Sequence, residues 1–144
     1  MKGFRMLLMP VGLAYGLVTH ARNKLYDWRL LASRKFELPT IGVGNLAVGG
    51  AGKTPLIEYM IRLFLREGLY PITLSRGYKR KTTGFVLATD ASVVDEIGDE
   101  PLLYKTKYQI NVAVDANRVR GIRNLIRMFG RQDPVILLDD VYQH

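Results

Sequence analysis

A glycine-rich turn between an expected strand and an expected helix constrains the fold of this chain more than any other feature. Residues 40–43 are rich in β-branched side chains, residues 49–54 read Gly-Gly-Ala-Gly-Lys-Thr, and residues 56–66 have the apolar spacing of an amphipathic helix. Glycines let backbone N–H groups converge on one point, and a helix N-terminus adds unpaired donors and a partial positive charge. The sequence therefore predicts a phosphate-binding loop at this turn.

The last residues of the turn extend this prediction to a nucleoside triphosphate. Lys53 can reach the β- and γ-phosphates, and the hydroxyl of Thr54 can hold Mg²⁺. The strict motif has glycine where this chain has Ala47, so an ordinary glycine-rich turn with a surface lysine is the alternative. The expected strand and helix on either side favour the phosphate-binding interpretation, and Pro55 fits a first helical turn because its missing N–H costs nothing there.

Apolar strands alternate with helical patterns from residue 38 onwards. Strands are expected at residues 40–43, 70–74, 85–88, 110–114 and 134–138, and helices at residues 56–66, 102–107 and 117–129. Helices between apolar strands predict an α/β domain over residues 38–144, with a mostly parallel sheet covered by helices on both faces. In such sheets, ligands bind at the carboxyl ends of the strands.

Residues 1–37 differ from this domain in composition. The chain has a net charge of +8, and its first 40 residues hold seven basic and two acidic residues, or +5. The apolar run at residues 6–18 is shorter than the roughly 20 residues that span a bilayer. We therefore expect an N-terminal amphipathic helical segment at residues 1–37 that lies at a membrane surface. The alternatives are a helix packed on the protein's own core, a solvated basic helix, and a signal peptide, which lacks a clear cleavage site here.

Other classes of partner and site are not predicted. The chain has no cysteine, which excludes a disulfide framework and a thiolate metal site. No zinc finger or RNA-reading aromatic motif is found, so nucleic acid is not expected as a partner.

Two acidic pairs are further candidates for the site. Asp139 and Asp140 follow the apolar run at residues 134–138. An acid at the end of a strand beside a phosphate loop orders Mg²⁺, although a solvated aspartate is the alternative. Asp99 and Glu100 precede an expected helix, and on spacing alone Asp99 is an N-cap rather than a general base.

A basic loop at residues 75–81 (Ser-Arg-Gly-Tyr-Lys-Arg-Lys) follows the second expected strand. It lies at the end of the sheet where ligands bind, so it could hold an anionic substrate or phosphate. A solvated turn is the alternative.

Taken in order, these motifs resemble the tetraacyldisaccharide 4′-kinase family, the lipid A 4′-kinases of Gram-negative bacteria. The resemblance spans residues 39–144 and is carried by Val43-Gly44-Asn45-Leu46, Val48-Gly49-Gly50-Ala51-Gly52-Lys53-Thr54-Pro55, Leu74-Ser75-Arg76-Gly77-Tyr78, Gly98-Asp99-Glu100-Pro101 and Asp139-Asp140-Val141-Tyr142-Gln143-His144. The family's loop also lacks the glycine that Ala47 replaces, whereas Gly-Phe is usual where this chain has Val141-Tyr142.

The resemblance implies a P-loop NTPase-like kinase that transfers the γ-phosphoryl group of ATP to the 4′-hydroxyl of tetraacyldisaccharide 1-phosphate, a lipid A precursor. The resemblance also implies that the enzyme acts at the cytoplasmic face of the bacterial inner membrane. By motif, it implies ATP binding by Ala47, Val48, Gly49, Gly50, Ala51, Gly52, Lys53 and Thr54, and Mg²⁺ binding by Thr54, Asp139 and Asp140. It further implies catalytic roles for Asp99, Lys53 and Asp139, with Asp99 as general base, and substrate contacts from Ser75, Arg76, Tyr78 and Glu100.

Family members are much longer than this chain, which is therefore expected to be an N-terminal part without the C-terminal lobe. Its last strand is then expected at an open edge of the sheet. Two alternatives to an active kinase are considered: a membrane-associated nucleotide-binding switch of the partitioning or targeting type, and an inactive fragment. Of these, only the kinase needs Asp99 as a base toward a sugar hydroxyl.

Overall fold

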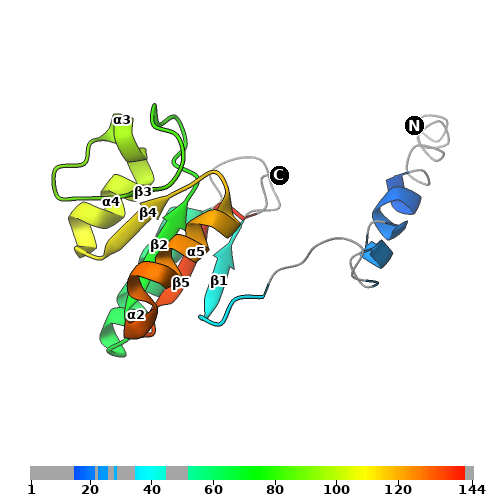
Figure 1. Cartoon of the computed structure of the whole chain (residues 1–144), viewed down its shortest axis with the longest axis horizontal. Helices are drawn as coiled ribbons and strands as arrows, with labels where there is room; N and C mark the ends of the chain where they lie inside the picture. The colour runs from blue at the N-terminus through cyan, green and yellow to red at the C-terminus, as the bar shows by residue number, and fades with distance from the viewer. Residues whose placement is uncertain (1–14, 22, 26–27, 29–34, 45–51, 142–144) are drawn as a thin grey trace. The chain divides into compact units, whose positions relative to one another are not determined.

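The structure, a computed structural model, describes residues 15–21, 23–25, 28, 35–44 and 52–141 (Figure 1). The chain divides into two units, Met1–Lys35 and Phe36–His144. Residues 47–51 of the predicted phosphate loop lie outside the described residues, whereas Gly52, Lys53 and Thr54 lie within them.

The first unit is helical at residues 15–21 and 23–25. Its large exposed apolar side chains include Tyr15, Leu17, Val18 and Trp28, which are between 64% and 73% exposed. The ammonium group of Lys24 lies 5.9 Å from the centroid of the Trp28 ring. No helix of the part that the structure describes is long and apolar enough to cross a membrane. Of the amphipathic helical segment predicted at residues 1–37, residues 1–14, 22, 26–27 and 29–34 lie outside the described residues.

The second unit is built on a five-stranded sheet. In spatial order the strands are β1 (Thr40–Val43), β5 (Val135–Asp139), β2 (Pro71–Ser75), β4 (Asn111–Val114) and β3 (Val86–Leu87). The first four strands pair in parallel, and β3 pairs with β4 in the antiparallel direction. The predicted mostly parallel sheet is therefore confirmed.

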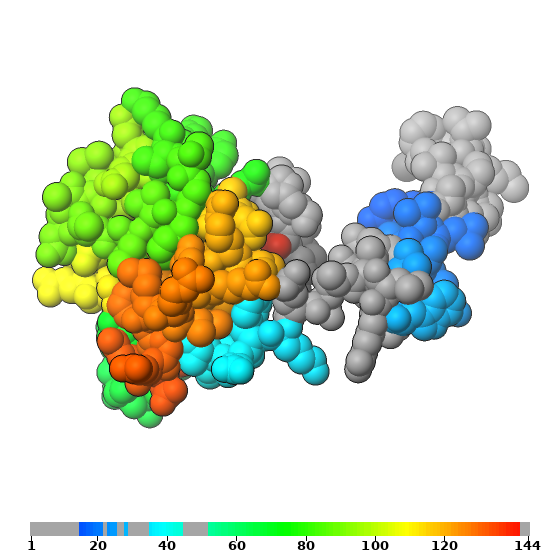
Figure 2. Space-filling model, in the orientation of Figure 1, coloured from blue at the N-terminus to red at the C-terminus, as the bar shows by residue number. Residues whose placement is uncertain are grey.

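Helices cover both faces of this sheet. The helices α2 (Lys53–Arg66) and α4 (Asp99–Tyr108) pack on one face, where the core contains Ile57, Ile61, Tyr104, Val112 and Leu137. The helix α5 (Arg118–Phe129) packs on the other face against Ile72, Leu74 and Ile136, and its exposed side faces the viewer in Figure 2. Neighbouring residues of β5 thus enter opposite cores, because successive strand side chains point to opposite faces.

The position of β5 corrects one expectation. This strand does not lie at an edge: it pairs with β1 on one side and with β2 on the other. The chain crosses back through α5 after β4 and inserts its last strand into the middle of the sheet. The buried run Val135–Leu137 fits this place, because a central parallel strand is covered on both faces.

Smaller differences concern element bounds. The third strand is only Val86–Leu87, and the short elements α3 (Val94–Ile97) and η1 (Gly130–Gln132) were not predicted. The helix α4 begins at Asp99, three residues before the predicted start, and this shift changes the interpretation of the acidic pair at residues 99–100.

Candidate active site

The carboxyl ends of β2 and β5 and the first turn of α4 surround one cavity of about 460 Å³. It is lined by Lys53, Ser75, Arg76, Gly77, Tyr78, Asp99, Glu100, Pro101, Asp139 and Asp140. Parallel strands end at the same edge of a sheet, so side chains that are distant in sequence meet there. Of the residues predicted for the site that the structure describes, all but Gly52 and Thr54 line this cavity, and Thr54 contacts Glu100.

Lys53 is the first residue of α2 and follows Gly52, which has a left-handed backbone conformation (φ 74°). The Lys53 ammonium group pairs with the carboxylate of Asp140. The backbone of Asp140, like that of Gly52, has a positive φ, of 64°. The hydrogen bond to Asp140 raises the pKa of Lys53, although partial burial opposes this shift. Lys53 is therefore a cation placed at the end of the sheet where the sequence predicts phosphates.

Thr54 connects the start of α2 to the start of α4. Its hydroxyl donates a hydrogen bond to Oε1 of Glu100 at 2.7 Å. This bond leaves the lone pairs of the Thr54 oxygen available to a cation. Glu100 therefore orients a residue of the predicted metal site from a different helix.

Asp139 is the last residue of β5 and is only 1% exposed. Burial raises the pKa of its carboxyl group to about 6, and the negative charges of Glu100 and Asp140 add to the effect, whereas Lys53 opposes it. The hydroxyl of Tyr104 donates a hydrogen bond to Oδ2 of Asp139 at 3.4 Å. The site thus concentrates more negative charge than its cations balance.

The oxygen donors at this end of the sheet fit Mg²⁺. Thr54 offers a hydroxyl, and Asp139 and Asp140 offer carboxylates, which are the hard ligands that this ion prefers. Among the described residues, no three acidic or histidine side chains are grouped closely enough to hold a metal ion by themselves. This arrangement suits Mg²⁺, which keeps several waters and is usually held by one or two carboxylates together with substrate phosphates.

Asp99 is not an N-cap, contrary to the prediction from spacing. Gly98 is the N-cap residue of α4, with φ 95°, and Asp99 is its first helical residue. A side chain at Gly98 would come within 3.0 Å of the carbonyl oxygen of Tyr78, so glycine allows the loop after β2 to pack against the start of α4. As a result, the exposed carboxylate of Asp99 lines the same cavity as Tyr78 and Lys53.

The loop after β2 supplies another part of the cavity lining. Gly77 N–H donates a hydrogen bond to the hydroxyl of Ser75 at 3.2 Å, and Gly77 has a left-handed backbone (φ 71°). This turn leaves the neighbouring side chains of Arg76 and Tyr78 exposed along the cavity.

Two residues of the site were missed by the sequence analysis. Tyr104 looks like an ordinary core position on its helix, and no local pattern indicates that its hydroxyl reaches Asp139. Arg118 donates to the carbonyl oxygens of Asp115 at 2.6 Å and Asp139 at 2.9 Å, and so ties the ends of β4 and β5 together. Its place at the start of a helix after a strand is a weak signal that could have been used.

Comparison with known proteins gives consistent matches along the chain. The family model described as LpxK, tetraacyldisaccharide-1-P 4′-kinase, matches residues 4–144. A relative from Parabacteroides distasonis named tetraacyldisaccharide 4′-kinase is 51% identical over 143 residues, and the match covers 98% of this chain and 38% of that protein. A relative of the same name from Flavobacterium johnsoniae is 52% identical over 141 residues, with coverage of 97% and 41%.

A solved structure is also similar. It is LpxK from Aquifex aeolicus in complex with ATP, with a TM-score of 0.72 and 33% identity, and the match covers 98% of this chain and 45% of that one. The chain thus spans less than half the length of these three proteins. None of the three is named as a partitioning or targeting switch.

Proposed function

Because the chain belongs to the tetraacyldisaccharide 4′-kinase family, we propose that it forms the nucleotide-binding part of an enzyme that phosphorylates the 4′-hydroxyl of tetraacyldisaccharide 1-phosphate with ATP. The observation that carries this proposal is the cavity at the carboxyl ends of β2 and β5. It brings together the cation of Lys53, the carboxylates of the consecutive residues Asp139 and Asp140, and the separate carboxylate of Asp99. The ATP complex of the Aquifex aeolicus relative supports the nucleotide.

Phosphoryl transfer depends mainly on positioning and on neutralisation of the phosphate charge. Lys53, which pairs with Asp140 in this structure, would turn to the β- and γ-phosphates of the nucleotide. Thr54, Asp139 and Asp140 would hold Mg²⁺, which supplies further neutralisation of the phosphates when it is bound. Glu100, which accepts a hydrogen bond from the Thr54 hydroxyl in this structure, would keep that hydroxyl oriented when Lys53 changes partner.

Asp99 is the residue that we assign as general base. A sugar hydroxyl is a poor nucleophile until its proton is accepted, and a carboxylate in the same cavity as the phosphates can accept it. Asp99 is exposed and lines the same cavity as Arg76 and Tyr78, which we assign to the acceptor sugar. The acceptor hydroxyl would thus lie between the base and the terminal phosphate.

We assign the first unit to a membrane surface, at the cytoplasmic face of the inner membrane, where ATP is available. An acceptor with four acyl chains stays in the bilayer, so the enzyme must approach it there. The exposed side chains of Tyr15, Leu17, Val18 and Trp28, together with Lys24, support an interfacial role. Flotation of the full-length protein with anionic vesicles should fall when Leu17 and Val18 are both changed to Glu, and unchanged flotation would remove this assignment.

The kinase function is tested with full-length protein, Mg²⁺, radiolabelled ATP and the disaccharide 1-phosphate, followed by thin-layer separation of the lipid. Asp99→Asn should reduce transfer by about 10²- to 10⁴-fold, as expected for loss of a general base, and should leave ATP binding intact. Asp95→Asn is the matched control, because Asp95 pairs with Lys81 at the surface, outside the cavity. If Asp99→Asn transferred phosphate to the lipid as fast as the wild type does, the general base would be wrongly assigned.

A further inference from the structure

A second cavity, of about 420 Å³, adjoins the candidate active site. It is lined by residues 76–80, 82–84 and 116, and it shares residues 76–78 with the first cavity. The two cavities differ in charge. Among the residues that the structure describes, the first is lined by four acidic residues and two cations, whereas the second is lined by three cations and no acidic residue. The three cations are Arg76, Lys79 and Arg80.

The wall of this second cavity is fixed by internal contacts. The side chain of Arg80 lies directly over Gly77, where an added Cβ would come closer than 3.0 Å to it. The guanidinium group of Arg80 donates to the carbonyl oxygens of Gly84 at 2.7 Å and Val114 at 3.4 Å. The far side of the loop is held by α3, because the hydroxyl of Thr82 donates to the carbonyl oxygen of Glu96 at 2.5 Å. A loop that is held at both ends offers its charges at low entropic cost to a ligand.

Lys79 is an exposed cation of this cavity, as is Arg76, but of these two only Lys79 lies outside the first cavity. Its backbone has a positive φ of 59°, and its ammonium group lies 5.3 Å from the centroid of the Tyr78 ring. The nearby carboxylate of Asp115 is fully buried and is bound by Arg120 through two hydrogen bonds of 2.8 Å. The negative charge of Asp115 is therefore offset locally, and the cavity keeps an excess of positive charge.

The acceptor of the proposed reaction carries a phosphate as well as the hydroxyl that reacts, as the family description states. We propose that the second cavity binds this phosphate monoester. The ammonium group of Lys79 pairs with the phosphate, and the shared segment at residues 76–78 lies beneath the sugars. The proposal rests on the proposed kinase function. It explains why one loop lines two cavities of opposite charge: the acidic cavity suits the metal, the nucleotide and the base, whereas the cationic cavity suits an anion that does not react.

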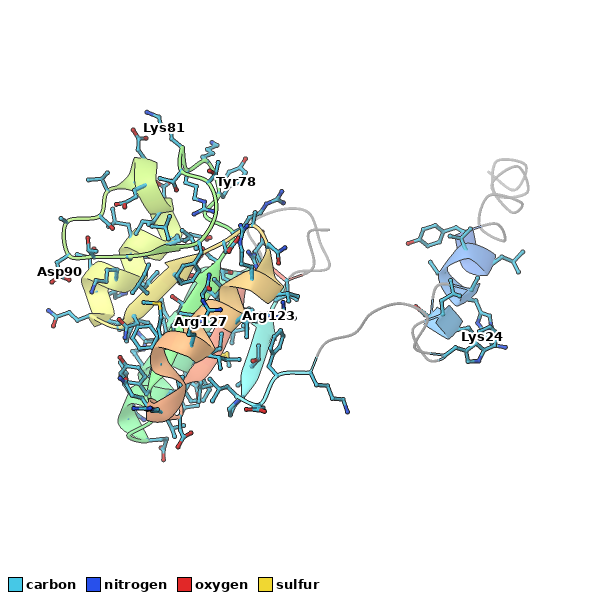
Figure 3. The ribbon with its side chains drawn as sticks, viewed as in Figure 1. Lys24, Tyr78, Lys81, Asp90, Arg123 and Arg127 are labelled. Atoms are coloured by element: carbon cyan, nitrogen blue, oxygen red, sulfur yellow. The ribbon has the colours of Figure 1, made fainter. Side chains whose placement is uncertain are left out.

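The test compares two acceptors in neutral detergent with full-length enzyme: the disaccharide 1-phosphate, and the same disaccharide with a free 1-hydroxyl. Lys79→Met keeps the apolar stem and removes the charge. Lys81→Met is the matched control, since Lys81 pairs with Asp95 outside both cavities and projects outward in Figure 3. Loss of one partly exposed charge contact should raise the KM for the phosphorylated acceptor about three- to tenfold, with kcat unchanged.

The expected pattern is specific to the phosphate. Lys79→Met should not change the KM for the acceptor with a free hydroxyl, and Lys81→Met should behave as wild type with both acceptors. An unchanged KM for the phosphorylated acceptor in Lys79→Met, or an equal rise for both acceptors, would overturn the proposal while leaving the kinase function intact. Absence of transfer to either acceptor by the wild type would instead overturn the kinase function, and this proposal with it.

Discussion

Replacement of Asp139 by Asn should stabilise the metal-free protein while it abolishes Mg²⁺-dependent nucleotide binding. The carboxyl group of Asp139 is 1% exposed, and burial together with Glu100 and Asp140 raises its pKa from an ordinary value of 3.8 to about 6. A raised folded-state pKa means that ionisation of this group at neutral pH destabilises the fold. A shift of about two units, at about 1.4 kcal/mol per unit, corresponds to about 3 kcal/mol. Because asparagine keeps the shape and an acceptor for Tyr104, we expect a gain of about 1–3 kcal/mol.

The sign of this effect fixes its dependence on pH. The destabilisation by Asp139 is absent well below pH 3.8, where the carboxyl group is neutral in both the folded and the unfolded state, and it is complete above about pH 6. Urea unfolding in the presence of EDTA should therefore show the free-energy difference between the variant and the wild type vanish as the pH falls well below 3.8, and should show a more stable variant at pH 7.5. A variant that is less stable than the wild type at pH 7.5 would refute the reasoning. Stability gained at the expense of a charged site is a common trade-off in enzymes.

Two further predictions concern neighbouring groups. Tyr104→Phe removes the hydroxyl that contacts Asp139, so calorimetry should show Mg²⁺-dependent ATP binding that is about two- to tenfold weaker. The control Tyr108→Phe, on the same helix but outside the cavity lining, should leave this binding unchanged. Burial alone would raise the pKa of Asp115, but the hydrogen bonds from Arg120 and from a backbone N–H outweigh this and lower it. The stability that the ionised Asp115 contributes is therefore present at neutral pH and is lost as the pH falls through its lowered pKa. Asp115→Asn should reduce the free energy of unfolding by about 1–2 kcal/mol at pH 7, and by progressively less as the solution becomes more acidic.

The local parts of the fold were predictable from the sequence because their signals are local. The strand at residues 40–43 begins and ends as predicted, and the helix after the glycine-rich turn differs only in starting at Lys53 rather than at residue 56. Asp139 could also be recognised, because an apolar run that ends in an acid indicates the end of a buried strand. In each case the residues that carry the signal are neighbours in the chain.

The relations between distant segments could not be predicted in the same way. The place of β5 between β1 and β2 depends on where the crossover through α5 returns, which strand patterns alone do not specify. The helix α4 begins at Asp99 rather than at the predicted residue 102, because Gly98 packs closely against the backbone of Tyr78, and this contact exists only in the folded chain. This tertiary contact exposes the carboxylate that spacing alone had assigned to an N-cap.

Tyr104 shows the same limit for side chains. A buried tyrosine on the inner face of a helix is usually explained by packing, and its apolar ring does lie in the core here. Its hydroxyl, however, reaches a carboxylate at the end of a strand 35 residues later in the sequence. Such a bond depends on the register of α4 against the sheet, so the polar function of the residue appears only in the structure.

The account depends most directly on the binding of a Mg²⁺-nucleotide between Lys53 and the pair Asp139–Asp140. Calorimetric titration of the full-length protein with ATP, with and without Mg²⁺, measures this binding. We predict binding that requires Mg²⁺ and weakens about 10- to 150-fold in Lys53→Met, the range expected for loss of a charge-assisted hydrogen bond. Lys107 pairs with Glu58 outside the cavity, so the control Lys107→Met should bind Mg²⁺-ATP as the wild type does. Absence of binding by the wild type, or equal binding by Lys53→Met, would contradict the account.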